Sequence, residues 1–203
     1  MNAPRHGEGL RLERSRASAQ FKDGKFQNPT GASPAMKGST WPVLGEFGVR
    51  FTATPSQHFS GRGLLSRNKT LWASWVIEAE RRKVFFSGDT GLIPGFADVG
   101  REHGPFDLVM LEVGAYHPAW GTIHLGPENA LTAFEMLGGG TLLPVHWGTF
   151  NLALHDWDEP AETLLSLATE RRARIVTPQI GAAFEPEHMD APTPWWRGVA
   201  RSR

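Results

Sequence analysis

Cysteine is absent from the 203-residue sequence. Its absence excludes disulfide scaffolds, thiolate zinc fingers, iron–sulfur centres and cysteine nucleophiles, so any metal ion must be bound by His, Asp or Glu. An excess of one charge is also absent, because 21 Lys and Arg residues balance 21 Asp and Glu residues. A general nucleic-acid-binding protein needs clustered positive charge, so we expect no nucleic-acid partner.

Long apolar runs are missing as well. No stretch approaches the roughly 18–20 consecutive apolar residues of a transmembrane helix, and the N-terminal residues lack the apolar middle of a signal peptide. We therefore expect a cytoplasmic protein that has at most peripheral contact with a membrane. Apolar residues still make up 40% of the chain, which is enough to form a packed core.

The chain divides into two stretches of different character. Residues 1–48 are polar, rich in Gly, Pro and Ser, and show no helical or strand period, which predicts an extended N-terminal arm. A disordered tail is an equal alternative for the first 18 residues. From residue 49 to residue 203, short apolar strands alternate with helices, which predicts an α/β fold. Strands are expected at 49–54, 71–78, 83–87, 107–113, 142–145 and 174–177, and helices at 94–103, 127–137 and 160–169.

Three of the predicted strands are followed by a metal-binding type of side chain. His58 follows the first strand, Asp89 lies in Ser-Gly-Asp-Thr-Gly after the third, and His146 comes directly after the strand at 142–145. Loops at strand ends converge in α/β sheets, and imidazole and carboxylate groups suit zinc. Each residue taken alone could equally be a turn residue with local hydrogen bonds. Their shared placement favours a metal site.

Six segments occur in a characteristic order: PSQHFS at 55–60, LWASWVIE at 71–78, FSGDTG at 86–91, GPFDLVMLEVGA at 104–115, HLGPENA at 124–130 and HWGTF at 146–150. Together they resemble the C-terminal half of the metallo-β-lactamase-fold phosphodiesterases related to N-acyl-phosphatidylethanolamine-hydrolysing phospholipase D. The resemblance implies an αββα sandwich, of which this chain would supply about one half (49–203) plus the arm.

The resemblance also implies roles for individual residues. It makes His58, Asp89 and His146 zinc ligands, with Asp89 bridging two zinc ions, and it places His124 beside the scissile phosphate. Asp89 and His124 would then be the catalytic residues. The implied activity is zinc-dependent phosphodiester hydrolysis, phospholipase D-like, on N-acylated phosphatidylethanolamine-type lipids or another phosphodiester.

One expected motif is missing. The resembling proteins carry a His-x-His-x-Asp-His motif, whereas no two of the eight His residues here are separated by one residue. His58, Asp89 and His146 alone would give each of two zinc ions two ligands, one of them shared, whereas a catalytic zinc normally has three.

Three interpretations follow from this departure. The first is a hydrolase that either receives further ligands from elsewhere, such as a partner chain, or is a shortened form of the active enzyme. The second is a non-catalytic truncated remnant that acts, if at all, through a partner. The third is a related hydrolase of a non-lipid substrate such as a sugar-lactone or a cyclic phosphate. Half a sandwich would leave one apolar sheet face uncovered, which a second copy of the chain could cover.

Two other features allow more than one interpretation. Trp195 and Trp196 near the C-terminus could contact a lipid interface, but a clamp onto the body of the protein is the preferred interpretation. Arg62 and Arg67 could contact a phosphate, and solvation at the surface is equally compatible with them.

Overall fold

The structure is a computed structural model that describes residues 48–61, 68, 72–150, 153–189 and 191–200, together with the backbone of three short strands nearer the N-terminus. The strands are β1 (Phe21–Lys22), β2 (Lys25–Phe26), β3 (Trp41–Val43), β4 (Arg50–Pro55), β5 (Ala73–Ala79), β6 (Arg82–Phe86), β7 (Leu108–Glu112) and β8 (Leu142–Val145). The helices are α1 (Gly95–His103), η1 (Pro118–Trp120), α2 (Gly126–Met136), α3 (Glu159–Arg171), η2 (Pro186–His188) and α4 (Trp196–Ala200).

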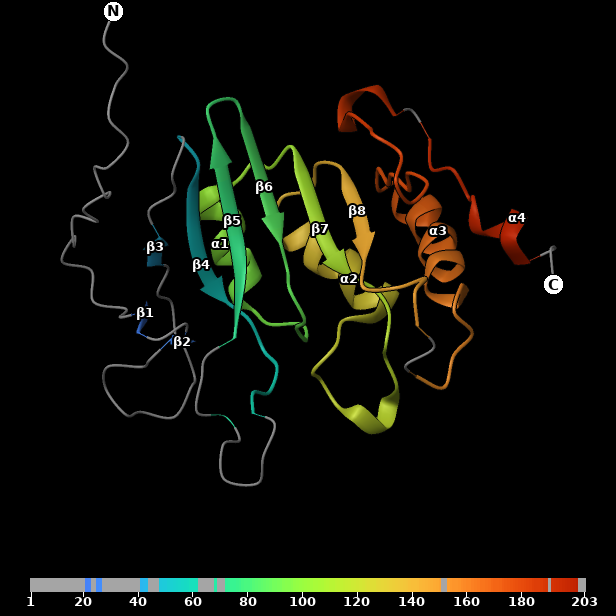
Figure 1. Ribbon diagram of the computed structural model, residues 1–203, viewed down its shortest axis with the longest axis horizontal. Coiled ribbons are helices and arrows are strands. Elements are labelled where there is room, and N and C mark those ends of the chain that lie inside the picture. Colours follow the sequence, from blue (N-terminus) through green and yellow to red (C-terminus); the bar gives the residue numbers. More distant parts are fainter. Residues whose placement is uncertain are drawn as a thin grey trace, which may run out of the picture.

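Six of the strands form one mixed sheet in the order β3-β4-β5-β6-β7-β8 (Figure 1). The pairs from β3 to β6 are antiparallel, and a tight turn at residues 80–81 joins β5 to β6. The pairs β6–β7 and β7–β8 are parallel, so α1 and α2 are the crossover connections that parallel strands require. The predicted α/β class is therefore confirmed.

The core lies between the sheet and its helices. Val76, Phe85, Val109 and Leu142 are paired in register across four neighbouring strands, and all four are fully buried. Because side chains alternate along a strand, this row points to one face, where it packs with residues of α1 and α2 such as Phe96, Leu131 and Phe134. Figure 1 shows α1 and α2 behind the sheet.

The opposite face of the sheet has a second apolar row. Trp75, Phe86 and Met110 are neighbours in register on β5, β6 and β7, and each is partly exposed. Among the labelled helices and strands of Figure 1, none lies in front of this face. The expectation that a second copy of the chain covers it stays a prediction.

The C-terminal segment packs against the body. Trp196 is fully buried, and its ring contacts the ring of Trp147 edge-on, with centroids 5.0 Å apart. The Trp196 indole N–H also donates to Glu162 Oε1 of α3 at 2.8 Å. The interpretation of this segment as a clamp is therefore confirmed for Trp196.

Two expectations need adjustment. The strand predicted at 174–177 is reduced to a single bridge between Leu142 and Ile175, and β3, inside the predicted arm, is the edge strand of the sheet. The division of the chain at residue 48 stays a prediction, because most of the arm lies outside the described residues, as do Arg62 and Arg67.

Within the described part, no helix is both long enough and apolar enough to cross a bilayer.

Candidate metal centre

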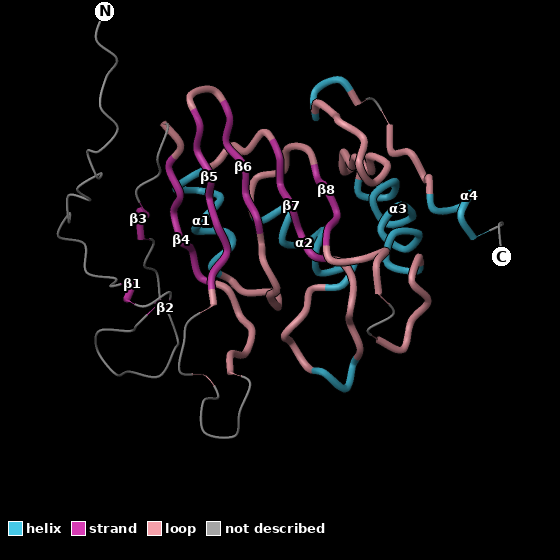
Figure 2. Tube along the Cα trace, viewed as in Figure 1, coloured by secondary structure: helices cyan, strands magenta, loops and turns pink. Residues whose placement is uncertain are grey.

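The directions of the strands bring several loops to one edge of the sheet. β4 and β6 are both antiparallel to β5, and β7 and β8 are parallel to β6, so these four strands all run the same way. Their carboxyl ends therefore meet at one edge, and Figure 2 shows the connecting loops gathered there. Side chains that follow these strands are held close together by a rigid scaffold.

The structure brings the four residues predicted from the sequence into one cluster. Asp89 Oδ1, after β6, lies 3.7 Å from His146 Nε2, after β8. The His146 ring stacks on the His124 ring with centroids 5.3 Å apart, and the His124 ring meets the His58 ring at 5.1 Å. His124 comes from the loop before α2 and His58 from the loop after β4. One carboxylate and three imidazoles thus occupy the same edge of the sheet.

The backbone around His146 is tightly constrained. His146 has a φ of +62°, a left-handed conformation that non-glycine residues adopt rarely and that is enriched at functional sites. Gly114 passes so close to it that a Cβ atom built there would lie 2.2 Å from the His146 carbonyl oxygen. The position of His146 is therefore set by the close approach of the segment after β7.

A fifth residue, Glu112, was not predicted from the sequence as part of the site. It lies at the end of β7 and is fully buried. Its Oε1 accepts hydrogen bonds from the backbone N–H groups of Thr90 at 2.8 Å and Leu125 at 3.1 Å. Its Oε2 lies 2.6 Å from His124 Nδ1 and 3.4 Å from His146 Nδ1. The available signal was a carboxylate at the end of an otherwise apolar strand, which is unusual because an unpaired buried charge is unfavourable.

Glu112 also affects the charge state of its neighbour. Burial lowers the pKa of His124, but the hydrogen bond and negative charge of Glu112, together with the charge of Asp89, outweigh it. The net effect is a pKa of His124 raised above its ordinary value. The site therefore stabilises the protonated form of this imidazole relative to that of a free histidine.

The residues present fit a divalent metal ion. His58 Nδ1 lies 3.0 Å from the carbonyl oxygen of Phe59, and a carbonyl only accepts, so this nitrogen carries the proton. In the neutral imidazole, His58 Nε2 is then the unprotonated nitrogen, and it is buried without a hydrogen-bond partner in the part of the chain that the structure describes. A buried nitrogen whose lone pair accepts no hydrogen bond is well suited to bind a metal ion.

One nitrogen or oxygen from each of Glu112, His124 and His146 also lies within 4.8 Å of the others, which is compatible with a metal ion. The 2.6 Å separation of Glu112 Oε2 and His124 Nδ1, however, is a hydrogen-bond distance. Two ligands of a tetrahedral zinc ion are roughly 3.3 Å apart, because each bond is about 2.0–2.2 Å long. These two atoms therefore suit a shared proton better than a shared metal ion.

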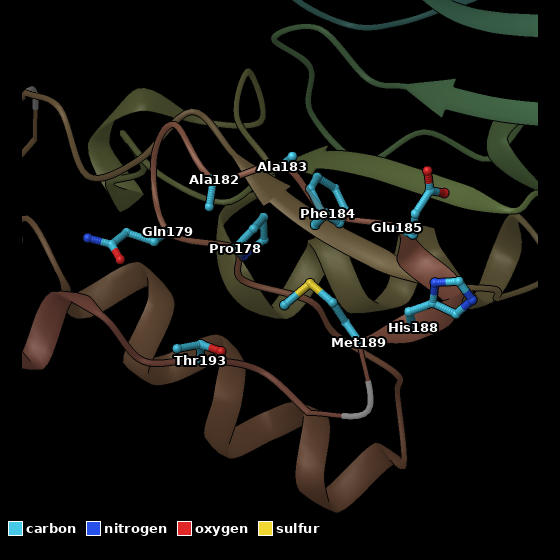
Figure 3. A pocket seen from close by; sticks show the side chains of 9 residues that line it. All are labelled: Pro178, Gln179, Ala182, Ala183, Phe184, Glu185, His188, Met189 and Thr193. Carbon is cyan, nitrogen blue, oxygen red and sulfur yellow. The ribbon is translucent and has the colours of Figure 1, made fainter.

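A small pocket opens beside His124. It has a volume of about 180 Å³ and is lined by Tyr116, His117, Pro118, Trp120, Gly121, His124, Leu125 and Asn129. Burial, followed by a hydrogen bond to Glu159, raises the pKa of Tyr116 to about 12, so this phenol is neutral at physiological pH. A larger hollow of about 560 Å³ lies on the C-terminal segment around Phe184 and Met189, and none of the candidate ligands lines it (Figure 3).

The sequence of this chain is similar to those of several known proteins. An uncharacterized protein of Mycobacterium tuberculosis is 47% identical over 146 residues, which are 70% of this chain and 39% of that protein. The N-acyl-phosphatidylethanolamine-hydrolyzing phospholipase D 1 of Caenorhabditis elegans is 32% identical over 139 residues, which are 64% of this chain and 39% of that protein. A UPF0173 metal-dependent hydrolase of Pelotomaculum thermopropionicum is 31% identical over 64% of this chain and 55% of its own length. The chain thus spans about two fifths of the length of the first two relatives.

A solved structure shares the fold. The isothiocyanate hydrolase from Delia radicum gut bacteria superimposes with a TM-score of 0.55 at 23% identity, over 71% of this chain and 57% of that one. The chain therefore shares the arrangement of sheet and helices of that hydrolase and covers part of it. The family model for the beta-lactamase superfamily domain matches residues 12–147, more than half of the sequence. With the strand-end cluster of His and Asp residues and these relatives, the match shows that the chain belongs to the beta-lactamase superfamily.

Proposed function

We propose that this chain builds the metal centre of a zinc-dependent phosphodiester hydrolase. His58, Asp89 and His146 would bind the metal, and Asp89 and His124 would take part in catalysis. The observation that carries the proposal is the convergence of these four side chains at one sheet edge, with His58 Nε2 buried and lacking a hydrogen-bond partner among the described residues. Homologous metal-dependent hydrolases point to a metal cofactor, and the choice of zinc rests on the His and carboxylate donors.

Each residue contributes differently to the proposed reaction. When bound, zinc would supply Lewis acidity to a phosphoryl oxygen and make water a better nucleophile. The Asp89 carboxylate has two oxygens and a negative charge, which suit it to bind two cations at once. The Nδ1 proton of His124 is directed to Glu112, so its Nε2 is available to exchange a proton with the leaving group.

Aromatic side chains near the site support a lipid substrate. Phe59, next to His58, is 45% exposed, and Trp120, whose ring lies 6.2 Å from that of His124, is 39% exposed. Phe150, four residues after His146, is 72% exposed. Exposed apolar rings around a polar centre suit peripheral contact with a lipid surface. With the name of the nematode relative, they favour an N-acylated phosphatidylethanolamine-type phospholipid.

The alternative of a non-catalytic remnant is favoured by one observation. The sequence contains no His-x-His-x-Asp-His motif, and three residues offer few ligands for two zinc ions. In the proposed hydrolase, the remaining ligands come from elsewhere, such as a partner chain, or the chain is a shortened form of the active enzyme. The two proposals differ in the amount of zinc bound and in turnover.

The test measures bound zinc per chain by elemental analysis together with hydrolysis of bis(p-nitrophenyl) phosphate, and then of an N-acylated phosphatidylethanolamine. Turnover with about two zinc ions per active site, abolished by His58→Ala and by Asp89→Ala, supports the hydrolase. His188→Ala is the matched control, because His188 is an exposed residue of η2 that contacts none of the candidate ligands in the structure. Less than about half a zinc ion per chain, with no turnover at any zinc concentration, overturns the hydrolase and supports the remnant.

A further inference from the structure

Glu112 connects three loops of the candidate site through one buried carboxylate. One oxygen accepts from the backbone of Thr90, the neighbour of Asp89, and from that of Leu125, the neighbour of His124. The other oxygen faces the Nδ1 atoms of His124 and His146. The backbone N–H of Glu112 donates to Ser87 Oγ at 3.1 Å, and Ser87 lies at the start of the loop that carries Asp89.

The contact with His124 determines where its proton resides. The carboxylate is fully buried, and Oε1 already accepts two backbone hydrogen bonds, which are made best to an ionised carboxylate. An ionised carboxylate can only accept, so the 2.6 Å contact requires the proton on His124 Nδ1. In the neutral imidazole, Nε2 is then the unprotonated nitrogen.

His146 has a related arrangement. Its Nδ1 is buried and has no regular hydrogen bond to the described residues, and it lies 3.4 Å from the same Glu112 oxygen. The ring stacks nearly parallel to that of His124, with an angle of 16° between the planes. Its Nε2 points to the opposite side, 3.7 Å from Asp89 Oδ1. Both rings therefore turn Nδ1 toward Glu112.

We propose that Glu112 is a positioning residue that keeps His124 and His146 in the Nδ1-protonated form, which leaves His146 Nε2 for the metal ion and His124 Nε2 for the leaving group. The expected effect on metal binding rests on the proposed function. The position of the proton on each imidazole, however, is a property of the metal-free protein. Outer carboxylates that fix the tautomer and orientation of a ligating imidazole are an effective way to raise its affinity for a metal.

The first test needs no variant. Long-range 1H–15N spectra of the metal-free protein distinguish protonated from unprotonated imidazole nitrogens, and the signals of His124 are assigned by their loss in His124→Asn. At a pH where the imidazoles are neutral, we expect His124 Nδ1 to be protonated and Nε2 unprotonated. An Nε2-protonated His124 in the unmodified chain overturns the proposal.

The second test uses Glu112→Gln. Its carbonyl oxygen can still accept from Thr90 and Leu125, but its NH₂ group then faces His124 Nδ1 and forces that nitrogen to accept. We expect His124 to change to the Nε2-protonated tautomer. Because His146, a proposed ligand, faces the same side chain, we also expect the zinc affinity, measured by calorimetry, to fall about 10–100-fold. Glu162→Gln, which removes a carboxylate of α3 bonded to Trp196 and Arg197, is the control and should change neither quantity.

The two proposals fail in different ways. A chain that binds no zinc but has His124 protonated on Nδ1 contradicts the proposed function and supports the role of Glu112. A chain that binds zinc with unchanged affinity in a folded Glu112→Gln variant contradicts the role of Glu112 and leaves the proposed function standing. Circular dichroism establishes whether the Glu112→Gln variant is folded. If the variant is unfolded, the 1H–15N spectra of the unmodified chain decide whether His124 is protonated on Nδ1.

Discussion

Among single residues, Glu112 has the most demanding surroundings. Placing an ionised carboxylate in the interior is unfavourable by several kcal/mol unless hydrogen bonds and opposite charge offset it. Here two backbone N–H groups and the imidazole of His124 provide that compensation. The same contacts make the residue hard to replace.

Glu112→Ala should therefore lower the free energy of unfolding by about 3–5 kcal/mol, because it leaves two buried N–H groups and a largely buried imidazole without their partner. Urea denaturation followed by circular dichroism measures the change. A loss below about 1 kcal/mol would contradict the buried network described above.

Gly114 offers a second prediction for a single residue. In Gly114→Ala the new methyl group would meet the His146 carbonyl oxygen at 2.2 Å, so the loop that carries His146 must move. We expect a loss of about 1–3 kcal/mol in stability, as for other overpacked sites, and weaker zinc binding in calorimetry. Gly95→Ala is the control, because a Cβ there makes only an ordinary 3.5 Å contact with Ile93. Equal zinc affinity in the two variants would show that His146 does not depend on this close approach.

Among the elements, the short helix α4 holds the loop after β8. Trp196 is fully buried against Trp147, the residue that follows His146. Trp196→Ala should cost about 3–5 kcal/mol in unfolding free energy, as large-to-small changes in cores do. Trp196→Phe keeps an aromatic ring but loses the hydrogen bond to Glu162, and we expect it to retain most of that stability. Chemical denaturation compares the two, and similar losses below 1 kcal/mol would argue against the clamp.

The contact between α3 and α4 should depend on pH. Arg197 donates to both oxygens of Glu162, at 2.7 and 2.6 Å, and this hydrogen bonding lowers the pKa of Glu162 against the opposing effect of burial. A carboxyl whose pKa is lower in the folded chain adds stability above its unfolded pKa of about 4.3, and this stability is lost as the pH falls through the folded value.

The stability difference between the unmodified chain and Glu162→Gln should therefore be largest at neutral pH and shrink on acidification. Thermal unfolding over a pH series measures it. Glu170→Gln, an exposed position on the same helix, is the control for the substitution itself. A difference that grows toward low pH would contradict the assigned contact.

For the whole molecule, metal binding should raise the thermal stability of the folded chain. A ligand that binds only the folded chain stabilises it by mass action, by about 2.7 kcal/mol at a concentration 100 times its Kd. For a chain of this size that corresponds to a rise of about 5–10 °C in Tm. We expect the rise on adding zinc to the unmodified chain and its loss on chelation or in His58→Ala and Asp89→Ala. Calorimetric scans measure it, and an equal rise in both variants would place the metal elsewhere.

Most of the elements could be predicted from local patterns. The apolar run of β7, and the helical spacing that begins near Pro127, are local signals, and both elements lie within two residues of their predicted bounds. The strand expected at 174–177 was wrong in extent, because whether an apolar run pairs depends on a neighbouring strand. The lack of Cys excluded thiol-based sites without any structure, whereas the expectation of no nucleic-acid partner stays a prediction.

Of the candidate site, His58, Asp89 and His146 could be named from the sequence because each follows a strand. Glu112 could not, since its role depends on contacts with Thr90, His124 and Leu125, which lie 12 to 22 positions away in the chain. The sequence by itself determined the residue types available for chemistry, the succession of strands and helices, and the family resemblance, all of which are properties of neighbouring residues. Only the tertiary structure decided which side chains share a site and which groups each imidazole faces, because hydrogen bonds and burial between distant segments exist only once the chain is folded.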